Sequence, residues 1–160
     1  MPRLVQTPWL IAVVSAAALG AFSCSPTAPA DQFEISIKRE IQRKCVGAEP
    51  CTIRLTAATS FSWDTLYVFP YPTTRSEIET VLGKPVHEYT EFSKRFVFVL
   101  NGEIVHEEST PINVEHPLNG EVLFGDQNGP LAYDRLPASG TFSVERVSSP
   151  TGEVFLLKRP

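Results

Sequence analysis

Histidines and acidic residues are the side chains through which this chain could do metal or acid–base chemistry. The run His106-Glu107-Glu108 places His106 and Glu108 on one face of a strand, where they could supply two ligands to a metal ion. A metal site needs three or four ligands, so Glu115 or His116 would have to join them from elsewhere. The motif H-E-x-x-H is absent, and the H-x-E pattern of deaminases lacks its later C-x-x-C. We therefore interpret this run as a solvated strand face and expect no metal ion and no cofactor.

Motifs of nucleophilic and phosphoryl chemistry are also missing from the sequence. There is no G-x-S-x-G elbow and no phosphate-binding glycine loop. An enzyme would need an unfamiliar carboxylate site, for instance Asp64 with Glu88 or Glu91. No spacing brings these residues together, so we assign no catalytic residues and expect a protein that is not an enzyme.

An aromatic-rich stretch, residues 61–71, is the best candidate for binding. Its rings alternate along the chain and are expected to share one strand face: Phe61, Trp63, Tyr67, Phe69 and Tyr71. Such rings can form a platform for sugars or peptides, or they can fill a core beneath a helix, which is the interpretation we favour. We expect Trp63, Asp64 and Tyr71, at the ends of the stretch, to reach the surface and to be possible binding residues. Asp64 could instead cap a neighbouring backbone amide.

The same stretch predicts a strand, a turn and a capped helix. Leu66 and Val68 put apolar side chains on the second face, which indicates an interior strand of a covered sheet. Proline residues at 70 and 72 end this strand, because proline cannot donate to the ladder. Thr74 and Glu77 then have capping-box spacing, and Gly83 suits the left-handed stop of the helix.

A hairpin is predicted around Asn101-Gly102, the favoured two-residue turn. In that register Val99 opposes Ile104, and Arg95 opposes Glu108 as a pair of opposite charges.

The other segments complete an α+β pattern. Residues 33–46 fit a short helix better than a strand, residues 52–56 and 121–124 fit strands, and residues 125–140 fit a long surface loop. A last hairpin pairs residues 141–147 with 153–157. The expected fold is an antiparallel sheet of about five or six strands packed by one or two helices, in a single domain over residues 33–160.

The N-terminus predicts export. Arg3 precedes an apolar run from Trp9 to Phe22, and small residues follow, which is the pattern of a secretory signal peptide over residues 1–23. The run is too short to cross a bilayer core of about 30 Å as a helix rising about 1.5 Å per residue.

Ala21-Phe22-Ser23-Cys24 resembles the cleavage box of bacterial lipoproteins, although that box prefers a small residue where this chain has Phe22. The resemblance implies lipidation of Cys24, a flexible tether over residues 24–32, and, from Ser25, sorting to the outer membrane on its periplasmic side. Ordinary signal-peptide cleavage after Ala28-Pro29-Ala30 is the alternative, and it would give a soluble periplasmic or secreted protein.

The cysteine count agrees with a lipid anchor, because three cysteines leave one over in an exported protein. If Cys24 carries lipid, Cys45 and Cys51 remain to form a structural disulfide, with turn-forming residues between them.

Charge argues against one class of partner. Without the signal peptide, the loss of Arg3 leaves 13 of the 14 basic residues against 18 acidic ones, a net charge of −5. Nucleic-acid binding needs a basic surface, so we exclude it. The basic residues at 38, 39, 43 and 44 could face anionic lipid, but we interpret them as the solvated side of a helix.

The order of helix, Gly, Pro and strands in TRSEIETVLGKP and FVFVLNGEIV resembles small envelope lipoproteins that assist outer-membrane barrel assembly. It implies a membrane-anchored binding or accessory protein with an envelope protein partner. An inhibitor or immunity protein against a periplasmic hydrolase, using residues 125–140 as a plug, and a small envelope hydrolase are the two alternatives.

Overall fold

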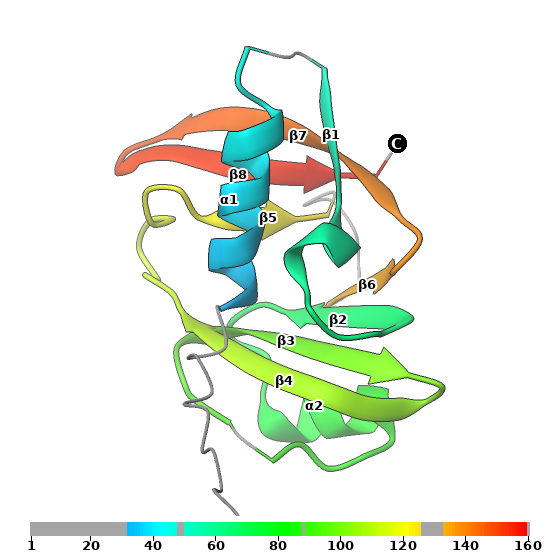
Figure 1. Ribbon diagram of the computed structural model, residues 1–160. Helices are drawn as coiled ribbons and strands as arrows, with labels where there is room; N and C mark the ends of the chain where they lie inside the picture. Colours follow the sequence, from blue (N-terminus) through cyan, green and yellow to red (C-terminus); the bar gives the residue numbers. More distant parts are fainter. Residues whose placement is uncertain (1–31, 48–49, 88, 126–132, 160) are drawn as a thin grey trace, which may run out of the picture.

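Two four-stranded sheets and two α-helices make up the computed structural model, which describes residues 32–47, 50–87, 89–125 and 133–159 (Figure 1). Sheet A has the order β1-β7-β8-β5, and sheet B has the order β4-β3-β2-β6. The helices are α1 (Phe33–Lys44) and α2 (Arg75–Leu82), and a 3-10 turn covers Leu55–Ala58. The strands of sheet A are β1 (Cys51–Arg54), β7 (Thr141–Ser149), β8 (Gly152–Lys158) and β5 (Val122–Phe124). Those of sheet B are β4 (Glu103–Pro111), β3 (Ser93–Leu100), β2 (Thr65–Phe69) and β6 (Asp134–Pro137).

Helix α1 packs against both sheets. It confirms the prediction of a helix, rather than a strand, for residues 33–46. Ile37 and Ile41 are fully buried one helical turn apart, in the same core as rings from both sheets. The basic residues of α1 pair within the helix: Lys38 lies 3.6 Å from Glu34, and Arg43 and Lys44 each lie 2.8 Å from Glu40. These pairs form the polar side of the helix.

Helix α2 begins and ends where its caps predict. Thr74 Oγ1 accepts a hydrogen bond from the Glu77 amide, and the Thr74 amide donates to Glu77 Oε2 at 2.7 Å, which completes the capping box. Gly83 ends the helix with φ of 66°, the left-handed conformation that glycine adopts without strain. Below sheet B in Figure 1, α2 covers the face opposite to α1.

Strand β2 lies between β3 and β6 and is covered on both sides, as predicted for an interior strand. Leu66 and Val68 face the core that contains α1, whereas Phe69 faces the core beneath α2. The expected alternation over residues 61–71 is wrong at its start. Trp63 belongs with Leu66, because β2 begins only at Thr65 and the bend before it turns the earlier rings to the other side.

The hairpin at Asn101-Gly102 forms, but its predicted register holds only next to the turn. Val99 does oppose Ile104, and a β-bulge then shifts the ladder, so that Arg95 opposes Ser109 instead of Glu108. An extra residue in β4 changes which face each later side chain occupies. Glu108 is thereby opposite Phe96, from where it reaches α1.

The α+β class is confirmed, whereas the expected single sheet of five or six strands is wrong. The eight strands of the described residues divide into two sheets, and β5 pairs with β8 in parallel. Strand β6 falls inside the expected loop of residues 125–140, of which residues 126–132 lie outside the described part. The final hairpin forms as expected, with β7 and β8 longer and the turn shorter than predicted.

The predicted disulfide joins Cys45 at the end of α1 to Cys51 at the start of β1, and both are buried. Closing this short loop lowers the conformational entropy of the unfolded chain, which stabilises the folded state by about 2 kcal/mol.

Replacing Cys45 and Cys51 together by serine should lower the free energy of unfolding by about 2 kcal/mol or more, since buried packing is lost as well. Urea denaturation of the lipid-free protein measures it. Reductant should move the wild-type midpoint toward that of the variant and leave the variant unchanged. Equal midpoints for the two proteins without reductant would contradict a stabilising bridge.

Candidate functional site

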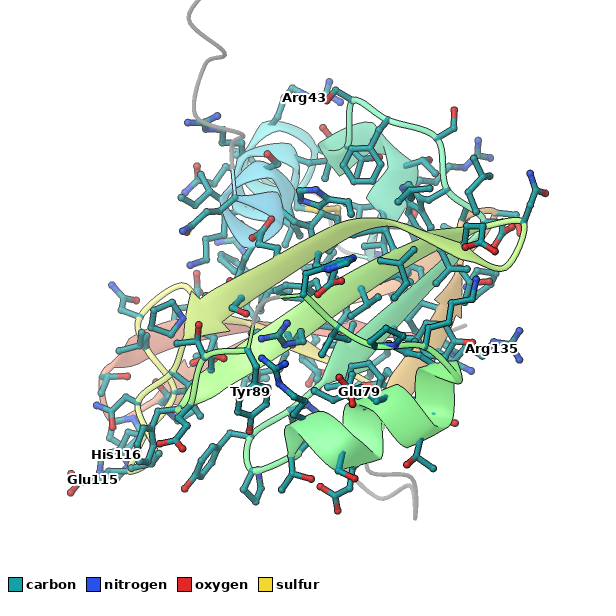
Figure 2. The ribbon with its side chains drawn as sticks, turned by 90° about the horizontal axis from the view of Figure 1, so that it is seen from below. Arg43, Glu79, Tyr89, Glu115, His116 and Arg135 are labelled. Carbon is teal, nitrogen blue, oxygen red and sulfur yellow. A yellow bond between two sulfur atoms is a disulfide. The ribbon has the colours of Figure 1, made fainter. Side chains whose placement is uncertain are left out.

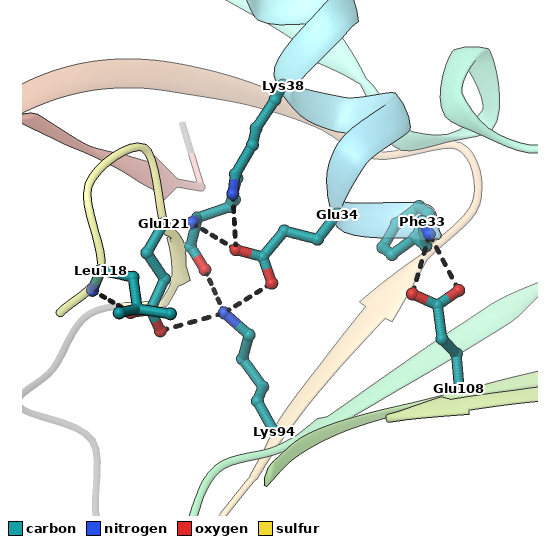
Figure 3. A network of polar contacts seen from close by, with 8 residues as sticks. Phe33, Glu34, Lys38, Lys94, Glu108, Leu118 and Glu121 are labelled. Carbon is teal, nitrogen blue, oxygen red and sulfur yellow. Dashed lines mark hydrogen bonds and ion pairs between the residues drawn. The ribbon is translucent and has the colours of Figure 1, made fainter. Parts of the chain in front are cut away.

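His106 and Glu108, which the sequence places on one strand face, both make contacts with other parts of the fold. The His106 ring packs against Phe61, with ring centroids 4.9 Å apart, and its Nε2 lies 3.8 Å from Glu108 Oε2. Both oxygens of Glu108 accept from the Phe33 amide at 2.8 Å, so Glu108 caps the start of α1 from a distant strand (Figure 3). In the described ranges no three histidine, cysteine or acidic side chains gather to hold a metal ion.

Glu115 and His116 do not join His106 and Glu108. Figure 2 shows both at the outer end of the connection between β4 and β5, pointing away from the sheets. They are exposed to solvent, while Glu108 is directed toward α1.

Asp64 acts as the cap that the sequence suggested, because its Oδ2 accepts from the Asn101 amide at 2.7 Å in the β3–β4 turn. The Asp64 amide itself donates to Val99 at the end of β3. Glu91 precedes the opposite end of β3, about 25 Å away at the rise of an extended strand. Asp64 and Glu91 therefore cannot form a carboxylate pair, and Glu88 lies outside the described residues.

A buried charge cluster, formed by Glu34, Lys94 and Glu121, joins α1, sheet B and sheet A (Figure 3). The Lys94 ammonium lies 3.1 Å from Glu34, 3.3 Å from Glu121 and 2.7 Å from the Val122 carbonyl. Glu34 also accepts from the Val122 amide, and Glu121 accepts from the Leu118 amide. Lys94 thus donates two hydrogen bonds and forms an ion pair with Glu34, all within the protein, which indicates a structural role.

Burial raises the pKa of the Glu108 carboxyl, and the amide of Phe33 and the neighbouring His106 oppose that shift. A carboxyl whose pKa is higher in the folded than in the unfolded state favours folding most when it is protonated. Its contribution is therefore largest below the unfolded pKa and is lost as pH rises through the folded pKa.

Glu108→Gln keeps an oxygen for the Phe33 amide and removes the charge, so the stability of this variant relative to the wild type should increase as pH rises from 4 to 7. Urea unfolding across that pH range measures the difference. Glu103→Gln, an exposed carboxylate at the start of the same strand, is the matched charge-removal control. A constant difference between Glu108→Gln and the wild type at all pH values would contradict the burial of this charge.

An apolar hollow of about 270 Å³ opens between α2 and the outer edge of sheet B. We call it the aromatic hollow, because rings of Phe69 and Tyr133, 5.4 Å apart, form one side of it. Helix α2 forms the other side through Ser76, Thr80 and Val81, and Thr73 and Glu77 complete the lining. It is a candidate binding site among the described residues.

The rings of the aromatic hollow continue along sheet B. Tyr67 stacks on Phe69 with an interplanar angle of 8°, and Tyr133 lies 6.0 Å from Tyr67 across the strands. Helix α2 has only eight residues and buries Phe69, which is 1% exposed, whereas Tyr67 and Tyr133 stay partly exposed. Sequence reasoning missed this site, because Tyr133 lies in a stretch expected to be a loop and the α2 hydroxyls carry no motif.

The remaining predicted binding residues, Trp63 and Tyr71, lie in different environments. Trp63 is only 6% exposed and donates from its indole Nε1 to Thr59 Oγ1 at 3.0 Å, so its ring belongs to the core. Tyr71 is 41% exposed and stacks on Phe92, which is 54% exposed, with centroids 5.4 Å apart. We call Tyr71 and Phe92 the aromatic pair.

Backbone geometry directs the aromatic pair outward. Phe92 has φ of 52°, a left-handed conformation that is rare for a residue with a bulky side chain. Its carbonyl accepts from the Ile112 amide at 3.0 Å, which fixes it beside the end of β4. An exposed ring held in a strained conformation makes this position a candidate for a functional role.

None of the helices in the described ranges is long and apolar enough to cross a membrane. Comparison with protein families, curated proteins and solved structures finds no match to this chain.

Proposed function

We propose that this protein is a lipid-anchored, non-enzymatic binding module of the cell envelope, and that the aromatic hollow receives a segment of an envelope protein partner. The hollow carries the proposal, because it is open, mostly apolar and lined on one side by the partly exposed ring of Tyr133. The side chains that could do acid–base chemistry also support a non-enzymatic role, because Asp64, His106 and Glu108 are engaged in caps and ring contacts.

The size of the aromatic hollow favours a protein segment as its occupant. At about 270 Å³ it is smaller than the roughly 300–1,000 Å³ of sites that enclose small molecules. It can take one or two apolar side chains, and the hydroxyls of Ser76 and Thr80 lie at its α2 wall. Anchor residues of this kind supply most of the free energy of a protein interface.

The anchor is proposed at Cys24, from which residues 24–32 lead into α1 at Phe33. It would hold the domain at the periplasmic face of the outer membrane. Cleavage after Ala30 would instead release a soluble protein with the same hollow.

The accessory role fits better than inhibition of a hydrolase or hydrolysis itself. A plug over residues 125–140 would need a projecting loop, and β6 instead ties part of that stretch to β2 in sheet B. A hydrolase would need converging acids, whereas Asp64 and Glu91 stand at opposite ends of β3.

Cys24→Ala in the full-length precursor should move the protein from the membrane fraction to the soluble periplasmic fraction, since no lipid can be attached. Fractionation of cells and a test for incorporation of labelled fatty acid measure the change. Thr27→Ala, a substitution of similar size in the tether, is the matched control and should leave the protein membrane-bound. Unchanged membrane association of Cys24→Ala would contradict the anchor.

Thr80→Trp should abolish partner capture by filling the aromatic hollow, and Thr56→Trp, an exposed position on the 3-10 turn, should not. Both sites are exposed, so the change in stability should stay within about 0.5 kcal/mol. Affinity capture from envelope extract with each protein, followed by identification of what the wild type and Thr56→Trp retain, is the measurement. Equal capture by Thr80→Trp would exclude the hollow as the binding site.

A further inference from the structure

The aromatic pair lies at the end of sheet B where the chain enters the domain. Phe92 directly precedes β3, and Lys94, two residues later, contacts Glu34 in the first turn of α1. In Figure 1 the start of α1 stands over the end of sheet B at which β3 begins and β4 ends. The point where the tether joins the domain and the exposed rings therefore lie at the same end of the molecule.

The tether limits how far this end can be from a lipid-modified Cys24. Residues 24–32 span at most about 30 Å when fully extended and less when they are not. The end of the domain that carries Phe33 is thus kept close to the bilayer surface, at a high effective concentration. Exposed side chains at this end meet lipid more often than those on any other face.

The chemistry of the exposed side chains suits the interface between lipid headgroups and acyl chains. Tyrosine has an apolar ring and a polar hydroxyl, and aromatic residues are enriched at that depth of a membrane. The connection from β4 to β5 leaves from the same end and adds Val114, which is 59% exposed. Two rings and one aliphatic side chain are too few for the core of a stable protein interface, which buries about 800 Å² on each partner.

We propose that the aromatic pair, Tyr71 and Phe92, is a membrane-contact site that inserts into the lipid interface and orients the anchored domain. This orientation rests on the proposed lipid anchor at Cys24. It turns the start of α1 and the aromatic pair toward the bilayer. The hairpin turn at Asn101-Gly102, at the other end of β3 and β4, then points away from the membrane.

Tryptophan reporters in the full, lipidated protein test this orientation. The signal peptide takes Trp9 with it, and buried Trp63 gives a constant background. Phe92→Trp is the first reporter and Tyr71→Trp the second, in case either substitution disturbs folding. Val105→Trp, 42% exposed near the hairpin turn of β4, is the matched control. The proteins are reconstituted into vesicles of phosphatidylethanolamine and phosphatidylglycerol with brominated acyl chains.

Brominated chains should quench most of the added emission at positions 92 and 71 and leave that at position 105 unchanged. Equal emission with brominated and plain lipid at both reporters, in protein that floats with the vesicles, would overturn the orientation while the anchor stands. Shielding of position 92 only after envelope extract is added would assign the pair to a protein partner and overturn it as well. Failure of the full chain to float with the vesicles would overturn the anchor and the orientation together.

Discussion

The buried ammonium of Lys94 is the constraint on which the arrangement of this domain depends. A charge that is 6% exposed is tolerated only if it is paired and hydrogen-bonded, and its partners come from α1 and from the segment that leads into β5. Glu34, Glu121 and the Val122 carbonyl can meet Lys94 only when both sheets are closed around α1. Apolar contacts alone are less directional and would permit other relative positions of the sheets.

This constraint also fixes the place where the chain enters the domain. Glu34 in the first turn is tied to Lys94, and the Phe33 amide is tied to Glu108 on the edge strand. The start of α1 is therefore held by β3 and β4 together, and the Phe33 amide, which has no partner within the helix, is satisfied by Glu108. The proposed tether joins the domain at this end, which the contacts of Glu34 and Phe33 tie to β3 and β4.

The sequence predicts local features of this fold well and long-range ones poorly. The capping box at Thr74, the turn at Asn101-Gly102 and the Cys45–Cys51 bridge depend on neighbours in the chain, and all three form. The division into two sheets depends on contacts such as Lys94 with Glu121, which no periodic pattern records. The bulge in β4, which places Glu108 where it reaches α1, likewise has no local signal.

The candidate sites follow the same division. The rings of residues 61–71 were recognisable as a group, but only the fold decides that Trp63 is core and that Tyr71 is exposed. The backbone of Phe92 is strained, since its φ of 52° is unfavourable by about 1–2 kcal/mol for an L-residue. Stacking on Tyr71 offsets about 0.5–1.5 kcal/mol of that cost. Folding alone thus gains little from a phenylalanine at this position, where asparagine or glycine would fit the backbone better. The proposed contact with lipid gives the aromatic ring at position 92 a reason that the fold alone does not supply.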